Sequence, residues 1–481
     1  MQKKFYITTP IYYANQRPHI GTAYTTVAGD VLARYYRSKG KQVFFLTGTD
    51  EYGEKIEQAA EKAGKSSQDF VDEISKTFKK AWKVLNISYD DFIRTTEQRH
   101  KKGVEKFLLK LKENKKIYQD DYRALYCVGC EDFIFKKDLT DDGKCPYHQK
   151  EPKMVSEKNY FFKLSDFLKQ VKELIKSDEM VIEPKERKNE VLSLIEQDLD
   201  NFSISREKVK WGIPLPFDKK QVCYVWVEAL QNYITAIGYE NDQKKFDKFW
   251  PADIHLLAKD IVKFHAIFWP ALLLANGLKL PKKIFVHGFF TVNGQKMSKT
   301  LGNVIDPIYL ADKYGVDALR YFLMREISFG QDGDFSIKRL EERYNSDLAN
   351  GLGNLVSRVL TLSEKIDVVP DKVKKFRDKE LGKKIKSVQD KYEKAIKEIK
   401  LNEALEVVWK LIGFCDEYIE RNKPWELSKS EPEKFKQIIL YLLYALKEIA
   451  FLLEPFLPDT SEKILNQIKQ NKKTETLFPR L

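Results

Sequence analysis

The chain of 481 residues lacks the long uninterrupted apolar run that a membrane span requires. Its most apolar stretch, residues 438–457, carries Lys447 and Glu448 in the middle and Pro455 near its end, so it predicts a buried helix of a bundle. The N-terminal stretch has charge but no long apolar region after it, so no secretion signal is expected. We therefore expect a cytoplasmic protein that does not bind membranes.

Cysteine is also scarce, and its distribution argues against a disulfide framework. Three of the five cysteines lie close together, in two pairs of the form Cys-x2-Cys and Cys-x2-His separated by fourteen residues. Two chelating pairs at this spacing are typical of a tetrahedral zinc knuckle, in which all four positions are protein ligands. The alternative is free cytosolic cysteines. The predicted ligands of one structural Zn²⁺ are Cys127, Cys130, Cys145 and His148.

Negative charge is under-represented: 84 Lys and Arg oppose 71 Asp and Glu, for a formal net charge of +13. A basic surplus on a protein of this size indicates an anionic partner, with nucleic acid as the first candidate. A lysine-rich surface that serves only solubility is the alternative, and charge alone does not separate the two.

The sequence has no internal repeat and no low-complexity linker. Two strand-like runs, residues 5–13 and 42–50, flank a helical pattern that starts near His19, which predicts a βαβ unit with parallel strands. From about residue 119 the pattern breaks into a turn-rich insertion, and strand–helix alternation resumes over residues 222–293. Beyond about residue 340 only long amphipathic helices follow. We expect an α/β doubly wound parallel sheet, split by an insertion and followed by an α-helical bundle.

The first candidate site is the stretch QRPHIGTAY, residues 16–24, where a predicted strand ends and a predicted helix begins. Ligands of open parallel sheets bind beyond the carboxyl ends of strands, and helix N-termini attract phosphate. Gly21 has no Cβ and permits close approach of a ligand, while His19 can donate a hydrogen bond to a phosphate oxygen. An ordinary turn histidine beside a helix-start glycine is the alternative.

The second candidate site is GQKMSKTLG, residues 294–302, in a loop that follows a strand. Lys296 and Lys299 lie three residues apart between Gly294 and Gly302, as suits a mobile clamp on a polyphosphate. A solvated basic loop is the alternative. The pair of motifs is more specific than either one. Together, the HxG and KMSK stretches resemble the two signature motifs of class I aminoacyl-tRNA synthetases.

Within that class the chain resembles the methionyl-tRNA synthetase family, in its single-zinc-knuckle subtype. The matching blocks are TPIYYAN, FFLTGTDEYG, WGIPLP, YVWVEA, KDIVKFHAIFWPALL, DGDFS and DLANGLGN, and the resemblance runs from residue 5 to beyond residue 425. The stretch between the two sheet halves is too short for the editing insertion of the isoleucine, leucine and valine enzymes.

The resemblance implies a domain plan. Residues 1–118 and 214–293 would form the two halves of a Rossmann-like catalytic domain, and residues 119–213 a connective insertion with the zinc knuckle near the tRNA acceptor end. Residues 294–345 would hold the KMSK loop and stem-contact region, and residues 346–481 a helical anticodon-binding domain. We see no appended tRNA-binding barrel after the bundle, so a monomer is expected.

The implied activity is ATP-dependent activation of L-methionine to methionyl-adenylate, followed by transfer to the 2′-hydroxyl of the terminal adenosine of tRNA(Met), the initiator included. His19 and Thr22 would hold the phosphates from one side while Lys296 and Lys299 close from the other. The resemblance also implies that Gly21 and Asp260 bind ATP, which would carry Mg²⁺.

Aromatic residues suit a methionine side chain, because an unbranched thioether packs well against aromatic rings. Phe264 and several family positions lie at predicted sheet ends or on the helices after them, and Asp50, at a strand end, can pair with the substrate ammonium. Core packing is the alternative for each aromatic residue. The methionine-site residues that the resemblance implies, with Asp50, are Ile11, Tyr13, Asp50, Trp226, Ala229, Tyr233 and His265.

Three residues of the helical third match the anticodon readers of the family. Asn354 and Arg358 share a helical face at i, i+4, and Trp425 follows a proline at a predicted helix start. An exposed tryptophan beside polar donors suits stacking on unpaired RNA bases. A half-buried packing tryptophan is the alternative.

The chain departs from the family pattern at three positions. Thr22 replaces the second histidine of HxGH, Ala258 replaces a glycine, and Tyr52 replaces the histidine of DEHG. These departures favour a rival hypothesis, a non-catalytic tRNA-binding paralogue, whereas the intact KMSK loop and the aromatic set argue against it. A small-substrate nucleotidyltransferase would share the HxG motif but would not need the helical third.

Overall fold

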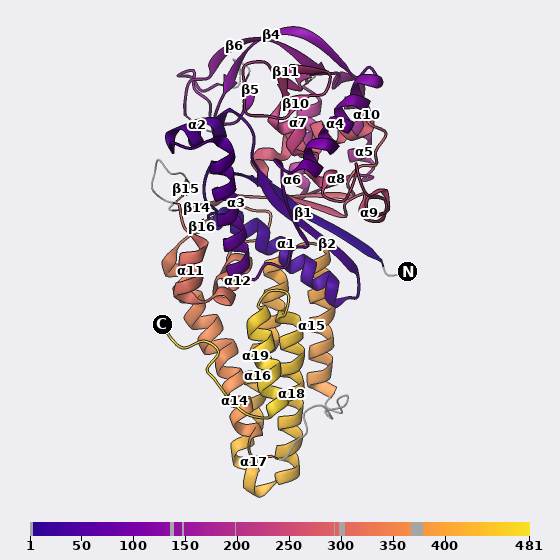
Figure 1. The fold of residues 1–481 in the computed structure, drawn as a ribbon. Helices are drawn as coiled ribbons and strands as arrows, with labels where there is room; N and C mark the ends of the chain where they lie inside the picture. Colours follow the sequence, from indigo (N-terminus) through magenta and orange to yellow (C-terminus); the bar gives the residue numbers. More distant parts are fainter. Residues whose placement is uncertain are drawn as a thin grey trace. The chain divides into compact units, whose positions relative to one another are not determined.

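The computed structural model describes residues 3–134, 139–146, 149–197, 199–292, 294–297, 304–366 and 379–481. These residues form two compact units, each assembled from several stretches of the chain (Figure 1). The first unit comprises Met1–Pro18, Gly40–Trp82 and Ser88–His287. The second unit comprises His19–Lys39, Lys83–Ile87 and Gly288–Leu481.

A six-stranded parallel sheet organises the first unit. Its order is β3-β2-β1-β12-β13-β7, so β1 (Lys4–Tyr13) pairs with β2 (Gln42–Asp50) on one side and with β12 (Ile254–Ala258) on the other. Residues 5–9 of β1 are all buried, as expected for a strand covered on both faces. The other strands of this sheet are β3 (Asp91–Arg94), β7 (Val181–Glu183) and β13 (Lys283–His287).

The strand order confirms the doubly wound fold. Chain order runs outward from β1 through β2 and β3 on one side, and through β12 and β13 on the other. The carboxyl ends of β1 and β12 therefore border the crevice where such sheets bind ligands. The predicted strands 5–13 and 42–50 correspond to β1 and β2.

Two strands differ from the sequence expectation for the second half of the sheet. β11 (Asp218–Cys223) pairs antiparallel with β9 and β10 in a separate sheet, and its first half is polar and half-exposed, as suits a partly solvated sheet. The edge position beside β13 is taken by β7, which lies within residues 119–213. Part of that segment therefore contributes to the main sheet.

Two antiparallel sheets complete the strands of the first unit, in the orders β5-β4-β6-β8 and β10-β11-β9. β4 and β6 form a long ladder from Ile117↔Phe162 to Tyr126↔Lys153. β4 ends at Cys127, so this ladder leads directly into the cysteine cluster. The strands are β4 (Ile117–Cys127), β5 (Asp132–Ile134), β6 (Lys153–Phe162), β8 (Phe202–Ser203), β9 (Ser205–Arg206) and β10 (Pro214–Leu215).

Helices and a continuous aromatic core pack with the parallel sheet. Trp269 and Phe107, both fully buried, stack with ring centroids 6.2 Å apart. The helices described for this unit are α2 (Glu54–Lys62), α3 (Ser67–Val84), α4 (Gln98–Glu113), α5 (Ser165–Lys176), α6 (Lys185–Ile195), α7 (Val225–Ala229), α8 (Asn232–Thr235), α9 (Gln243–Phe249), η2 (Lys259–Ile261), η3 (Phe264–Phe268) and α10 (Trp269–Ala275).

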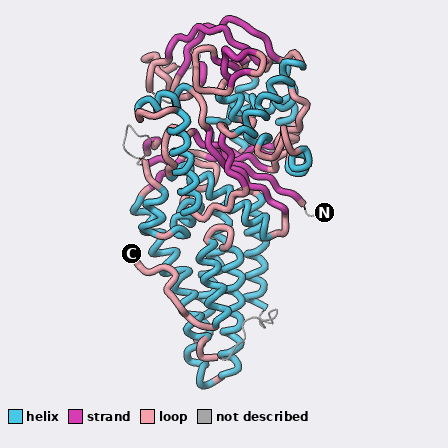
Figure 2. Tube along the Cα trace, in the orientation of Figure 1, coloured by secondary structure: helices cyan, strands magenta, loops and turns pink. Residues whose placement is uncertain are grey.

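The second unit is mostly helical, as Figure 2 shows for its C-terminal part. It also contains a three-stranded sheet of order β15-β14-β16, made of β14 (Phe290–Val292), β15 (Gln295–Lys296) and β16 (Gly333–Phe335). The predicted bundle is present. The helices described for this unit are α1 (Ile20–Ser38), α11 (Pro307–Tyr314), α12 (Val316–Arg325), α13 (Ile337–Arg343), η4 (Tyr344–Gly353), α14 (Asn354–Ser363), α15 (Lys379–Lys397), α16 (Leu401–Asn422), α17 (Pro424–Ser430), α18 (Pro432–Leu453) and α19 (Pro458–Gln470).

The most apolar segment of the chain forms α18. Ten of its residues, including Phe435, Leu442 and Leu453, are buried, and the helix contacts α14, α16 and α19. Among the described residues no helix combines the length and apolar character that crossing a bilayer demands. The prediction of a buried bundle helix is confirmed.

Candidate active site and metal site

Tyr13 and Asp50 end neighbouring strands at the carboxyl edge of the parallel sheet. They are register partners as the last residues of β1 and β2. The register shifts between Thr8 and Ile11, where Pro10 has no N–H to donate to the ladder, so β1 bulges just before Tyr13. Gly48 lets β2 lie close to both neighbouring strands, because a Cβ there would lie 2.0 Å from the Ile93 carbonyl oxygen and 3.0 Å from Ile11 Cγ2.

The carboxyl group of Asp50 is only partly satisfied. Its Oδ1 is buried and has no hydrogen-bond partner among the described residues. Burial raises the pKa of Asp50 well above its ordinary value, and the charge of Glu131 raises it further, whereas the N–H groups of Tyr52 and Glu51 lower it. A cation beside Asp50 would satisfy the carboxylate and offset the cost of burying it.

Aromatic rings gather on the helices that follow the strands. Trp226 of α7 stacks on Phe264 of η3, with ring centroids 3.9 Å apart and planes 3° apart. Trp226, Ile11 and Tyr13 are partly buried and pack against the core of the first unit, to which Tyr233 belongs. Ala229 and Tyr233 are 5% and 1% exposed. Ile11, Tyr13 and Trp226 therefore keep exposed surface that a ligand can contact.

His265 is held in one tautomer. Its Nδ1 lies 2.9 Å from the carbonyl oxygen of Ile261, which only accepts, so Nδ1 carries the proton. Its Nε2 lies 2.8 Å from Tyr233 Oη and accepts from that hydroxyl group when the ring is neutral. Burial lowers the pKa of His265 to about 4, and the hydrogen bond to Ile261 opposes that shift. Near neutral pH, Tyr233 and His265 form an uncharged pair.

The carboxyl end of β12 carries two of the family positions named above. Ala258 is the last residue of β12 and precedes the single-turn helix η2, in which Asp260 is exposed. Both residues lie at the edge of the sheet where β1 also ends. This placement agrees with the crevice expected at the point where the strand order reverses.

In the second unit, His19 caps the N-terminus of α1. Its Nδ1 accepts from Gly21 N at 3.1 Å, so the proton of a neutral ring is on Nε2. The Thr22 hydroxyl accepts from His19 N at 3.0 Å and donates to the His19 carbonyl oxygen at 2.7 Å. This is a reciprocal capping box. The single proton of Thr22 is thus committed to its own helix turn.

Met297 of the KMSK stretch and Ile305 beyond its end both contact this helix turn. A Cβ on Gly21 would lie 3.2 Å from Met297 Cε, and Ile20 N donates to the carbonyl oxygen of Ile305 at 3.0 Å. The structure therefore brings the HxG turn and the ends of the KMSK loop together within the second unit. Lys299 lies outside the described residues, and Lys296 is described only in its backbone.

The acidic block DGDFS holds the base of the same hairpin. Asp334 Oδ1 accepts from Gly294 N at 2.8 Å and from Thr291 Oγ1 at 2.7 Å. Asp332 Oδ1 accepts from Phe289 N at 2.8 Å. The sequence reading used DGDFS only as a family block, and its role in the hairpin depends on the pairing of β14 with β16.

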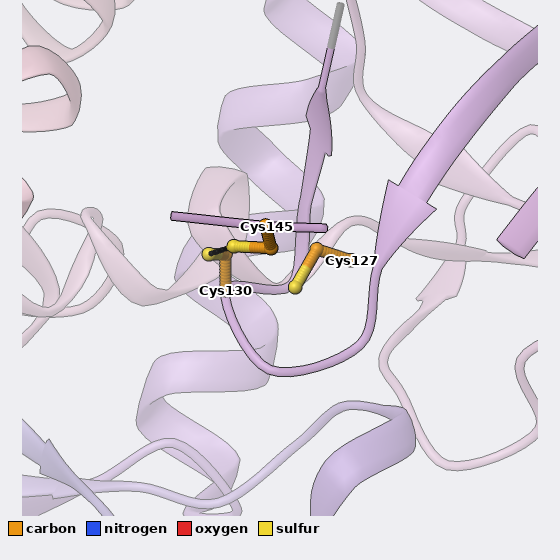
Figure 3. A group of neighbouring side chains, drawn as sticks. All are labelled: Cys127, Cys130 and Cys145. Atoms are coloured by element: carbon orange, nitrogen blue, oxygen red, sulfur yellow. Dashed lines mark hydrogen bonds between the residues drawn. The ribbon is translucent and has the colours of Figure 1, made fainter. Parts of the chain in front are cut away.

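Three of the predicted metal ligands form a cluster (Figure 3). The sulfur atoms of Cys127, Cys130 and Cys145 all lie within 4.8 Å of one another, and those of Cys130 and Cys145 are 3.5 Å apart. The N–H group of Cys145 donates to the Lys150 carbonyl oxygen at 2.9 Å. Three thiol groups at this separation fit one thiophilic ion with tetrahedral preference. His148 lies outside the described residues.

The helical candidates occupy the expected elements of the second unit. Asn354 is exposed at the start of α14, and Arg358 lies one turn further along it. Arg358 reaches Glu420 at 2.6 Å and Asp416 at 3.5 Å on α16. Trp425 follows Pro424 at the start of α17 and is 43% exposed, so part of its ring surface faces solvent.

Sequence reasoning missed one residue of the first unit entirely. Glu131, which directly follows Cys130, is 5% exposed and accepts from Lys55 N at 3.2 Å. Burial raises the pKa of Glu131 to about 7, and hydrogen bonds from Tyr13 and Lys55 N oppose the shift. No pattern in the sequence indicates this placement, because an acidic residue after a cysteine is ordinarily a solvated loop residue.

Comparison with known proteins covers both units. A family model described as "tRNA synthetases class I (M)" matches residues 5–153 and 137–360, and one described as "Anticodon-binding domain of tRNA ligase" matches residues 378–479. The chain is 44% identical to methionine–tRNA ligase of Thermotoga maritima over 477 residues, which cover 98% of this chain and 76% of the relative.

Two further similarities extend over nearly the whole of each chain. Methionine–tRNA ligase of Rickettsia felis is 44% identical over 487 residues, which cover 100% of this chain and 95% of the relative. The solved structure of Mycobacterium tuberculosis methionyl-tRNA synthetase in complex with methionyl-adenylate superposes with a TM-score of 0.94 at 36% identity, and the match covers 100% of both chains.

Proposed function

Because the chain belongs to the methionyl-tRNA synthetase family of class I tRNA synthetases, we propose that it charges tRNA(Met) with L-methionine in two steps. In the first, a carboxylate oxygen of methionine attacks the α-phosphorus of ATP, and pyrophosphate leaves. In the second, the 2′-hydroxyl of the terminal adenosine attacks the carbonyl carbon of methionyl-adenylate, AMP leaves and the hydroxyl proton is released.

The observation that supports this activity best is the meeting of the two signature motifs. Met297 lies against Gly21, and Ile305 accepts from Ile20, so the KMSK loop starts and ends at the turn that His19 caps. Phosphates bound at this helix N-terminus would meet the Nε2–H of His19 on one side and the lysines of the loop on the other. Such positioning and charge stabilisation need no covalent enzyme intermediate.

The ATP-site roles follow from this placement. We propose that His19, Lys296 and Lys299 stabilise charge on the phosphates, with Gly21 and Asp260 contributing to the nucleotide site. Thr22 would act by holding the α1 turn, because its proton already faces the His19 carbonyl oxygen. Mg²⁺ bound to ATP would neutralise part of the polyphosphate charge.

Methionine would be recognised by one charged group, which binds its ammonium, and by several apolar groups, which contact its side chain. Asp50, with its unpartnered Oδ1, would bind the substrate ammonium. The thioether would lie against aromatic faces, where sulfur–ring contacts are favourable. The residues proposed for this site are Ile11, Tyr13, Asp50, Trp226, Ala229, Tyr233 and His265.

The cysteine cluster would hold one Zn²⁺ in a structural role, with His148 as fourth ligand beside Cys127, Cys130 and Cys145. A site closed by four protein ligands leaves no position for a reacting water. We propose that the knuckle lies near the acceptor end of the bound tRNA. The other two cysteines, Cys223 and Cys415, are 3% and 1% exposed, and we propose that they are packing residues.

The helical bundle would read the anticodon of elongator and initiator tRNA(Met). Asn354 and Trp425 are exposed, and Trp425 offers a ring face for stacking. Arg358 is oriented by Asp416 and Glu420, so its remaining donors have a defined direction.

The test is methionine-dependent pyrophosphate–ATP exchange, run beside leucine, isoleucine and cysteine. We expect exchange with methionine alone, followed by aminoacylation of tRNA(Met). Folded, metal-loaded protein that binds tRNA(Met) but gives no exchange with any amino acid would instead indicate the non-catalytic paralogue.

A further inference from the structure

Glu131 combines two features that a loop residue does not ordinarily have. It is 5% exposed although it carries a carboxyl group, and its backbone has a φ of 50°. Residues other than glycine adopt this left-handed region uncommonly, and such outliers persist where surrounding contacts hold them. The contacts of Glu131 therefore hold both its side chain and its backbone in place.

The carboxylate joins two elements of the amino-acid site. Its Oε1 accepts from Lys55 N, in the first turn of α2, at 3.2 Å, where the helix N-terminus favours negative charge. The Tyr13 hydroxyl group donates to the Tyr52 carbonyl oxygen at 3.0 Å and shares its single proton with this carboxylate. Gly53 lets the Glu131 carboxylate and Tyr13 Oη lie close to the backbone before α2, because any Cβ there would overlap the carboxylate and lie 2.7 Å from Tyr13 Oη.

The backbone of Glu131 holds a third element. Its carbonyl oxygen accepts from Tyr224 Oη, and Tyr224 is the N-cap of α7, the helix that carries Trp226 and Ala229. A second link runs in parallel, because Lys55 Nζ donates to the Gly129 carbonyl at 3.2 Å and lies 5.6 Å from the centroid of the Tyr13 ring.

We infer that Glu131 is a positioning residue for methionine, because it ties together the three segments that carry Tyr13, Asp50 and Trp226. The inference rests on the proposed function, since it takes those three residues as methionine ligands. Glu131 acts through Tyr13 Oη and need not touch the substrate. The cysteine loop thereby sets the geometry of the amino-acid site as well as closing a metal site.

Glutamine at this position separates the two roles of the carboxylate, as acceptor for Lys55 N and as charged acceptor for the Tyr13 hydroxyl group. In Glu131→Gln the amide oxygen still accepts from Lys55 N, but the charged acceptor for the Tyr13 hydroxyl is lost. We expect KM for methionine in pyrophosphate exchange to rise about tenfold, the scale of one hydrogen bond to a charged group. KM for ATP is expected to change less than about twofold, since the side chain of Glu131 contacts the segments of the methionine site.

The design compares Glu131→Gln with Glu151→Gln, which makes the same change at an exposed position downstream of Cys145. It is repeated in a Tyr13→Phe background, where Glu131→Gln should add almost nothing. Metal content and Tm are measured for every variant, and methionine Kd is read from the change in intrinsic tryptophan fluorescence, independently of turnover.

Each outcome decides the inference. A methionine-specific rise that disappears in the Tyr13→Phe background supports it. An unchanged methionine KM, an equal rise in the Tyr13→Phe background, or a rise that accompanies metal loss overturns it. If the wild type binds methionine without exchange, the proposed function fails while the Kd comparison still tests Glu131. A wild type that does neither overturns both.

Discussion

The guanidinium group of Arg320 lies 2.8 Å from the carboxylate of Asp30, and neither side chain is exposed to solvent. Arg320 also donates to the carbonyl oxygens of Phe456, Pro455 and Leu85 at 2.8, 2.9 and 3.1 Å. One cation of the second unit therefore joins α1, α12, the turn between α18 and α19, and the end of the α3 segment. The helix that presents His19 is anchored to the bundle through it.

Asp30→Asn should destabilise the second unit strongly, because it leaves the buried charge of Arg320 without its anion. Breaking a buried ion pair by removing one partner costs about 3 kcal/mol or more. The measurement is urea unfolding, with amide exchange reporting on α1 and α12. Asp390→Asn removes an exposed partner of Lys386 on α15 and is the matched control, for which no measurable loss is expected. Equal effects of the two substitutions would contradict the anchoring role.

Thr22→Ala should loosen the first turn of α1, because the capping box loses its hydroxyl group. Loss of such a cap costs about 1 kcal/mol. Amide exchange at His19, which donates to Thr22 Oγ1, should accelerate about fivefold, and methionine-dependent exchange should slow. Thr22→Ser keeps the hydroxyl group and should behave as wild type. Unchanged His19 protection in Thr22→Ala would refute the capping role.

His265 should remain neutral, with its proton on Nδ1, down to about pH 5. Its folded-state pKa of about 4 lies below the ordinary value of 6.5, so the unfolded chain binds the extra proton first. The stabilising contribution is therefore complete above pH 6.5 and is lost as the pH falls toward 4. The slope is about 1.4 kcal/mol per pH unit in this window.

The readouts are imidazole ¹⁵N NMR and unfolding of wild type against His265→Gln between pH 7.5 and 4.5. Glutamine can accept from Tyr233 and donate to Ile261, so the stability difference should vary with pH only through the histidine. A His265 pKa near 6.5 would contradict the prediction. Buried His255, whose pKa is also lowered well below its ordinary value, is present in both proteins and cancels from the comparison.

Trp425→Ala should reduce aminoacylation by at least about tenfold and leave pyrophosphate exchange unchanged, because stacking of one base contributes about 1–3 kcal/mol. Trp425 is 43% exposed, so its truncation should leave the fold intact. Phe451→Ala, at a 51% exposed aromatic residue of α18, is the control and should charge tRNA normally. Loss of both activities in Trp425→Ala would mean that the residue is structural.

Metal analysis of protein purified without added zinc should find one tightly held equivalent. Cys145→Ser and His148→Ala should each release it and lower the Tm, because ligand loss opens the tetrahedral site. Cys415→Ala should retain the metal, since Cys415 is buried far along the chain from the cluster. Retention of the equivalent in Cys145→Ser would exclude the cluster as the site.

Much of the fold was accessible to sequence reasoning because its signals are local. The strands 5–13 and 42–50, the helix that begins after His19, and the bundle segment 438–457 follow from periodicity and turn residues over short windows. The cysteine spacing likewise predicted a cluster that the structure confirms for Cys127, Cys130 and Cys145. The edge strand β7 was missed, because three residues carry too little periodic signal.

The chemical state of the site was decided by contacts between distant residues. Lys55 and Glu131 are 76 positions apart, and Arg320 and Phe456 are 136 apart, so no local pattern encodes either hydrogen bond. The tautomer of His265 depends on Tyr233 and Ile261 together, and the unpartnered oxygen of Asp50 depends on burial by several elements. The sequence by itself determined which side chains could act as ligands, acids or bases. The tertiary structure decided which of them are buried, which are charged and which way they point. Those properties arise only when segments distant in the sequence pack together.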